Sequence, residues 1–291
     1  MHVQVVLFDG FDLMDAIAPY EVFAAAALFS GGAMTVELVA AEGRRSVPSG
    51  MQGPSIEAES ALDPDRPGII LVPGASGKPA GESEDAVPNI LRSAMETELT
   101  GLMKQAIANE EIIVATVCGG SLLLAMGGLL EGKHAVTNHL GMAALGATGA
   151  IPVRARVVED GPRFVSGGGV TSGLDVALYL IERELGPRIA NAVEELFEYE
   201  RRGTVWRAQG IEPIIFSGAG SDEAGHALSA DLPAANAGQM PDNAIDGNWQ
   251  TTIATPIGKM SVLLRISSHD GLIRGTATQG DEVAELLNPV W

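Results

Sequence analysis

Apolar residues in the first 207 positions follow two alternating patterns. Short runs of mostly β-branched residues without helical spacing are typical of strands buried on both faces of a parallel sheet. Segments with apolar residues three and four positions apart are typical of helices that pack on such a sheet. The predicted strands are 3–8, 34–40, 69–72 and 112–118, and the predicted helices are 16–29, 88–109 and a helix that starts at Ser121. This alternation predicts an α/β fold with a mostly parallel sheet.

The pattern continues with a hairpin and a pair of helices. Residues 153–159 and 163–166 surround Asp160-Gly161 and predict two paired strands. Helical patterning then runs from about 171 to 202, with a break at Gly186-Pro187. In α/β sheets ligands bind at the carboxyl ends of the strands, so the loops that follow 8, 72 and 118 are expected to frame the site.

Beyond this region the composition changes. Residues 208–246 are rich in Gly, Ala, Ser, Asp and Pro and predict a linker or mobile loop. Three short β-patterned stretches follow within 247–291, at 249–255, 259–266 and 272–277. The sequence therefore predicts an α/β domain over 1–207, a linker over 208–246 and a small β-rich module over 247–291. Three short strands form a small core, so the module is expected to pack against the main domain or against another protomer.

The only cysteine lies where the period changes from strand to helix. Cys118 follows a buried strand, and Gly119 and Gly120 remove the Cβ atoms that would crowd a sharp strand-to-helix turn. A thiol at a helix N-terminus feels the positive end of the helix dipole, so we expect its pKa to fall. Cys118 is the candidate nucleophile. The alternative is that an isolated buried cysteine is a small hydrophobic residue.

A nucleophilic cysteine needs a partner that moves protons. Asp15 is the best candidate, since it lies in the loop after the first strand and precedes an apolar helix. The alternative role is a helix N-cap, because Asp is a preferred cap and Pro19 falls in what is expected to be the first turn. The small residues after 72, including Gly74 and Ala75, together with Gly119, are expected to offer backbone N–H groups to an oxyanion. An ordinary turn explains the residues after 72 as well.

Two further side chains are weaker candidates. His139 follows the elbow helix in a β-like segment, where it could pair with Cys118 or cap the next helix. Glu21 fits the helix surface or a supporting position better than a catalytic one. Asp175 is expected at a helix start or turn.

Composition narrows the classes of partner. The formal net charge is −19, with 18 basic and 37 acidic residues, which opposes nucleic acid as a partner and suits a small-molecule substrate. One cysteine permits no internal disulfide, and the start of the chain has no signal-like pattern, so a cytoplasmic location is expected. Every apolar run is too short for a membrane span. No metal-ligand spacing is present in the tail, and no cofactor is expected.

Five segments carry a resemblance: 117–121 (VCGGS), 15–23 (DAIAPYEVF), 72–74 (VPG), 137–139 (TNH) and 173–178 (GLDVAL). Together they resemble the ThiJ/PfpI superfamily over roughly residues 1–207, and within it the isonitrile hydratase branch, which is related to the sensor domains of AraC-type regulators. The resemblance implies a flavodoxin-like sandwich, a homodimer and a cysteine on a nucleophile elbow that faces an acid from the first loop. It implies that Cys118 attacks an isocyanide, that Asp15 handles the proton, and that water releases an N-substituted formamide without a metal.

The sequence departs from that branch at two places. The hydratases usually have Thr after the cysteine where this chain has Gly119, and many relatives have a second glycine where this chain has Ala75. Two alternative functions stay open: a glyoxalase or deglycase in which Cys118 forms a hemithioacetal, and a redox or ligand sensor. AraC-type regulators carry a basic helix-turn-helix module after the sensor domain, whereas this tail is β-patterned and not basic, which argues against DNA binding.

Overall fold

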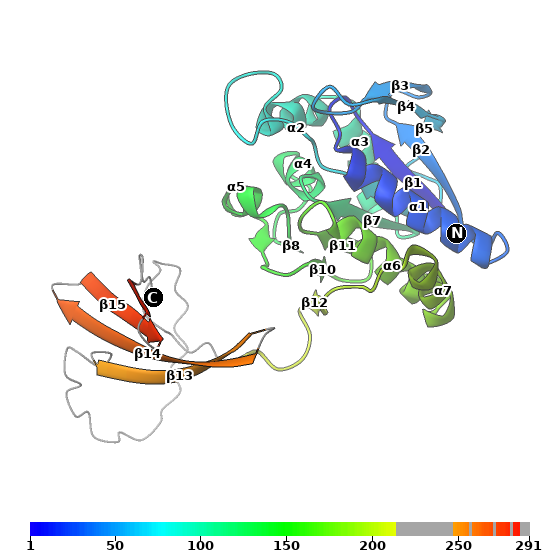
Figure 1. Ribbon diagram of the computed structural model, residues 1–291. Helices are drawn as coiled ribbons and strands as arrows, with labels where there is room; N and C mark the ends of the chain where they lie inside the picture. The colour runs from blue at the N-terminus through cyan, green and yellow to red at the C-terminus, as the bar shows by residue number, and fades with distance from the viewer. Residues whose placement is uncertain (214–246, 256–257, 270–271, 280–281, 286–291) are drawn as a thin grey trace, which may run out of the picture. The chain divides into compact units, whose positions relative to one another are not determined.

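The computed structural model describes residues 1–213, 247–255, 258–269, 272–279 and 282–285. The chain divides into two compact units, Met1–Gly210 and Ile211–Trp291, and each is described by itself (Figure 1). Most of the predicted linker lies outside the described residues. No described helix is long and apolar enough to cross a membrane.

The first unit is an eight-stranded sheet, counted over the described residues, with helices on both faces (Figure 1). The strand order is β12-β10-β11-β7-β6-β1-β2-β5, and only β10 and β11 pair antiparallel within it. Its strands are β1 (His2–Leu7), β2 (Thr35–Ala40), β5 (Ser60–Ala61), β6 (Gly68–Val72), β7 (Ile112–Val117), β10 (Val157–Glu159), β11 (Phe164–Gly167) and β12 (Val205–Arg207). Small two-stranded sheets are formed by β3 (Arg45–Pro48) with β4 (Ser55–Ala58) and by β8 (His134–Ala135) with β9 (Ile151–Pro152).

The helices form two layers around this sheet. One layer contains α1 (Leu13–Phe29), α6 (Ser172–Leu185) and α7 (Pro187–Phe197), which pack on one another. The other contains α2 (Val87–Met95), α3 (Leu99–Ala108), α4 (Gly120–Met126) and α5 (Met142–Ala147), with the 3-10 turn η1 (His139–Gly141) beside α5. The central strands β1, β6 and β7 are almost wholly buried between the layers, as their continuous apolar runs predict. The α/β prediction is confirmed.

Two helix predictions are wrong in detail. Residues 88–109 form two helices, because the Thr97 hydroxyl donates to the Ala94 carbonyl and accepts from the Leu99 N–H, which ends α2 and starts α3. The first helix begins at Leu13, so Pro19 lies inside it rather than in the first turn. Proline has no N–H, so the Asp15 carbonyl lacks its usual helical donor.

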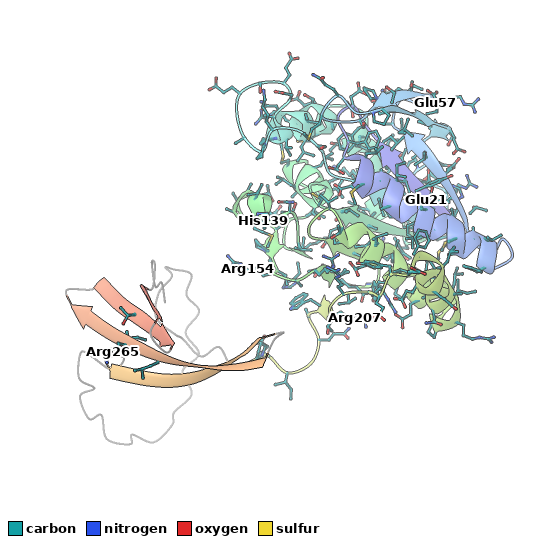
Figure 2. The ribbon with its side chains drawn as sticks, viewed as in Figure 1. Glu21, Glu57, His139, Arg154, Arg207 and Arg265 are labelled. Atoms are coloured by element: carbon teal, nitrogen blue, oxygen red, sulfur yellow. The ribbon has the colours of Figure 1, made fainter. Side chains whose placement is uncertain are left out.

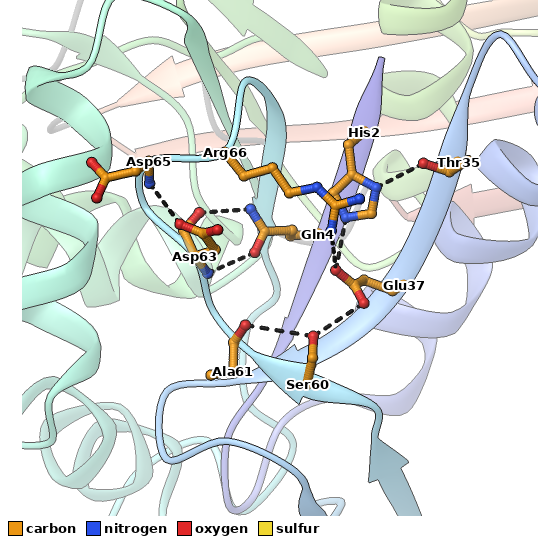
Figure 3. Close-up of polar contacts among 9 residues, drawn as sticks. All are labelled: His2, Gln4, Thr35, Glu37, Ser60, Ala61, Asp63, Asp65 and Arg66. Carbon is orange, nitrogen blue, oxygen red and sulfur yellow. Dashed lines mark hydrogen bonds and ion pairs between the residues drawn. The ribbon is translucent and has the colours of Figure 1, made fainter.

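Ionic side chains link neighbouring elements of the first unit. His2 lies between Thr35 and Glu37, at 2.7 and 2.8 Å, and Arg66 reaches the same Glu37 oxygen as His2 at 3.1 Å (Figure 3). On the other side, Asp175 is 2 % exposed and accepts from Arg156 Nε at 2.6 Å and from the Arg202 N–H at 2.7 Å. Asp175 therefore links α6 to Arg156 and to the backbone at Arg202. Its position near a helix start does not reveal this role.

The second unit contains an antiparallel four-stranded sheet in its described residues, in the order β13-β14-β15-β16. The strands are β13 (Gly247–Thr255), β14 (Gly258–His269), β15 (Leu272–Gln279) and β16 (Glu282–Glu285). Three of them cover the stretches that the β pattern predicts. Each pairs with the next along the chain, as hairpins do.

Candidate active site

The strand β7 delivers Cys118 to a sharp turn at the centre of the sheet. Cys118 has φ of 55°, a left-handed backbone conformation that residues other than glycine rarely adopt, and the residue is 6 % exposed. Its N–H donates to the Gly167 carbonyl at 3.0 Å, and its carbonyl accepts from the Thr137 hydroxyl at 2.7 Å. Strained backbone held in this way clusters at functional sites. The predicted elbow is therefore present in the backbone.

Gly120 lets the elbow turn against the neighbouring strand. A Cβ atom on Gly120 would lie 2.1 Å from the Val72 carbonyl oxygen, a backbone atom that cannot move aside cheaply. We expect Gly120→Ala to lower the free energy of unfolding by about 2–4 kcal/mol. Gly101→Ala is the matched control, because Gly101 lies exposed in α3 with open space around it, and alanine there is expected to stabilise by about 0.5–1 kcal/mol. Urea denaturation of both variants measures the contrast, and an unchanged midpoint for Gly120→Ala would contradict it.

Asp15 enters the same space from the first turn of α1. The N-cap of α1 is Asp12, whose carboxylate accepts from the N–H groups of Met14 and Asp15, so capping does not explain Asp15. The Asp15 side chain is fully buried, and its Oδ2 accepts from the Gly74 N–H at 3.0 Å. Its Oδ1 is also buried and has no hydrogen-bond partner among the described residues. Asp15 therefore keeps one buried carboxyl oxygen available for chemistry.

The turn after β6 brings Gly74 against the elbow. A Cβ atom on Gly74 would lie 2.5 Å from the Gly119 nitrogen and 2.8 Å from Asp15 Oδ2, so only glycine fits there. The Gly74 N–H is held by Asp15, which makes it a positioning donor in this structure and not a free oxyanion donor. The Gly119 N–H favours the thiolate form of Cys118, and Ala75 N would lie 3.5 Å from a Cβ on Gly119. Of the three predicted oxyanion donors, Ala75 and Gly119 stay predictions, because no backbone hydrogen bond from either N–H is found among the contacts described for the first unit.

Burial, together with the charge of the nearby Asp12, raises the pKa of the Asp15 carboxyl to about 8. The Gly74 N–H and the Cys118 thiol favour the carboxylate and oppose this rise. Because Oδ2 accepts from Gly74, a proton on Asp15 belongs on Oδ1. Near neutral pH the residue is therefore largely a buried carboxylic acid that can give up its proton.

The expectation that the thiol pKa falls is wrong. Burial, together with the Asp15 charge, raises the pKa of Cys118 to about 12, and the Gly119 N–H and the Asn138 side chain only partly offset this rise. The helix α4 has seven residues and begins two positions after the cysteine, so desolvation of the sulfur outweighs the helix dipole. Ionising this thiol therefore requires that its proton move to a neighbouring base, and Asp15 is that neighbour.

Asn138 is a contact that the sequence reasoning missed. Its Nδ2 lies 3.7 Å from Cys118 Sγ, and its Oδ1 accepts from the Leu140 N–H at 3.1 Å. The signal was available in part, because Asn is a preferred cap residue and precedes the candidate histidine directly. The sequence singles out His139, whereas the adjacent Asn138 makes the contact with Cys118.

The two weaker candidates lie on the surface. His139 is exposed in η1, and Glu21 is exposed on α1; Figure 2 shows them on separate parts of the molecule. Among the contacts described for the first unit, neither side chain is bonded to Cys118 or Asp15. The structure brings Cys118, Asp15, Gly74, Ala75 and Gly119 together, and His139 and Glu21 lie outside this group; the roles of these residues stay predictions.

A family model for the DJ-1/PfpI family matches residues 1–183. The chain belongs to the DJ-1/PfpI family. Within this family, the chain is 38% identical over 131 residues to isonitrile hydratase of Pseudomonas putida, an alignment that covers 45% of this chain and 51% of that protein. It is 36% identical over 114 residues to the HTH-type transcriptional regulator GbdR of Pseudomonas aeruginosa, covering 38% of this chain and 30% of the regulator.

A DJ-1/PfpI fold is also found among solved structures. A ThiJ/PfpI family protein from Pseudomonas syringae superposes with a TM-score of 0.57 at 25% identity, covering 69% of this chain and 76% of that chain. The flavodoxin-like fold and the superfamily resemblance are thereby confirmed. The chain spans about half or less of the length of these two curated relatives, so their whole activities do not transfer with the family.

Proposed function

We propose that this DJ-1/PfpI protein adds water to a small isocyanide and releases the N-substituted formamide. The observation that carries the proposal is the buried Oδ1 of Asp15, which has no hydrogen-bond partner among the described residues and lies beside a cysteine on a strained elbow. Such a pair can move one proton between sulfur and substrate without solvent. The 38% identity to isonitrile hydratase supports this choice of substrate class.

The reaction balances with these two side chains and one water molecule. Asp15 in its carboxylate form accepts the thiol proton, and the Cys118 sulfur attacks the terminal carbon of the isocyanide. Asp15 returns the proton to that carbon, which leaves a thioimidate in which carbon carries sulfur, hydrogen and the doubly bonded nitrogen. Water then adds to this carbon, the nitrogen takes a proton, and the carbon–sulfur bond breaks to release the formamide and the thiol.

Turnover of a small panel tests the proposal. The full chain is incubated with n-butyl isocyanide or with methylglyoxal, and the products are followed by NMR. We expect N-butylformamide to form at a rate proportional to protein concentration, because each chain has one Cys118 sulfur that can attack the terminal carbon of the isocyanide. Turnover of methylglyoxal alone would replace the proposal with the glyoxalase alternative, and consumption of neither compound would overturn both.

A sensor is the second candidate, and the 36% identity to the regulator GbdR favours it. The aligned segment covers only 30% of that regulator. The net charge of −19 on this chain opposes binding to nucleic acid, so the likeness supports a sensor and not a DNA-binding protein. A sensor would hold a small ligand at the elbow without releasing a product. Saturable ligand binding in calorimetry, with no product in the NMR assay, would favour the sensor over the hydratase. We also propose that the chain forms a homodimer, as the family resemblance implies, and this is compatible with either function.

A further inference from the structure

The segment 136–138 makes hydrogen bonds at three consecutive residues, to the neighbouring strand β11 and to Cys118. The Val136 N–H donates to the Ser166 hydroxyl at 3.1 Å, and the Thr137 hydroxyl donates to the Cys118 carbonyl at 2.7 Å. Asn138 follows, with its Nδ2 at 3.7 Å from the Cys118 sulfur. Val136 and Thr137 are both buried. The position of Asn138 relative to the sulfur is therefore set by the contacts that Val136 and Thr137 make with Ser166 and with the Cys118 carbonyl.

The orientation of the Asn138 amide is set independently. Its Oδ1 accepts from the Leu140 N–H at 3.1 Å, where Asn138 caps the 3-10 turn. An amide has one acceptor oxygen and one NH₂ group, so engaging the oxygen in the cap turns the NH₂ group toward the sulfur. His139 offers no substitute, because it is exposed.

We propose that Asn138 is a catalytic residue that stabilises the developing negative charge on the Cys118 sulfur by donating from Nδ2. A hydrogen bond to a charged acceptor is stronger than one to a neutral acceptor, so this donor favours the thiolate over the thiol. The Gly119 N–H also favours the thiolate. The Asn138 donor on the sulfur and the acid at its side make transfer of the thiol proton to Asp15 less costly. The inference rests on Cys118 being the nucleophile of the proposed function.

Two variants separate donation from capping. Asn138→Ser keeps an oxygen for the Leu140 N–H but is too short to reach the sulfur, and Asn138→Asp keeps the shape and the cap while replacing the donor with a carboxylate. His139→Ala is the matched control at the adjacent position. The readout is the pH dependence of Cys118 alkylation by iodoacetamide in the full chain, measured by intact mass.

We expect the alkylation profile of Asn138→Ser to move to higher pH, with the rate at pH 8 falling about three- to tenfold. Asn138→Asp should shift the profile further, and His139→Ala should leave it unchanged. A purely structural role would lower the melting temperature without moving the profile. Profiles of Asn138→Ser and Asn138→Asp that superimpose on the wild type would overturn the inference. Alkylation needs no isocyanide, so a shifted profile without formamide production would retain Asn138 and reject the proposed substrate.

Discussion

Replacing Cys118 with alanine is expected to reduce isocyanide turnover by at least about 10⁴-fold, because the protein then has no nucleophile to form the thioimidate. The full chain contains no other cysteine that could substitute. Formamide production measured by NMR gives the rate, and circular dichroism shows whether the fold is kept. An alanine variant that turns over at the wild-type rate would remove Cys118 from the mechanism.

The stability of the Cys118 variants gives an independent check on the elbow. At φ of 55° a side chain costs about 1 kcal/mol relative to glycine. Cys118→Gly should therefore unfold at a higher urea concentration than Cys118→Ala, although both are inactive. Equal stability of the two variants would mean that the left-handed turn stores no strain.

Asp15→Asn is expected to abolish turnover while making the protein more stable at pH 8. The amide oxygen of Asn can still accept from the Gly74 N–H, but the side chain can no longer carry a proton between sulfur and carbon. The pKa of Asp15 rises from 3.8 to about 8 on burial, so as the pH rises through this window the folded state loses stability relative to the unfolded chain. Removing the carboxyl is expected to return on the order of 2–5 kcal/mol at pH 8.

Wild-type turnover should carry the same titration. Ionisation of the thiol requires Asp15 in its carboxylate form, so the rate is expected to rise about tenfold per pH unit below pH 8 and to level off above it. The stability difference between variant and wild type, measured by urea denaturation from pH 4 to pH 9, checks the sign. A difference that is flat across this range would show that Asp15 is ionised throughout, and the proton transfer would need another group.

Most of the first unit could be predicted from the sequence because its strands are buried on both faces. The runs 3–8, 69–72 and 112–117 have no competing interpretation once helices separate them, and the structure places them side by side at the centre of the sheet. Short edge elements such as β5 and β12 have too few residues for a pattern. The helix break at Thr97 depends on one hydroxyl, which apolar spacing does not register.

The site shows the same division between backbone and side chains. Cys118, Gly74 and Gly119 could be found because glycines mark where two backbones approach closely. The Asn138 contact depends on how the segment 136–138 lies over the elbow. A shift of one position along the chain decides whether Asn138 or His139 reaches Cys118. The thiol pKa could not be judged from a helix start alone, because burial of the sulfur and the Asp15 charge outweigh the dipole of a seven-residue helix.

Trapping the covalent intermediate tests the central claim most directly. The full chain is mixed with n-butyl isocyanide, quenched with borohydride to reduce the thioimidate, and analysed by peptide mass spectrometry beside Cys118→Ala. The account predicts one butyl isocyanide plus two hydrogens on the peptide that contains Cys118, and no label on the alanine variant. An unlabelled Cys118 in protein that iodoacetamide still alkylates at that residue would contradict the account.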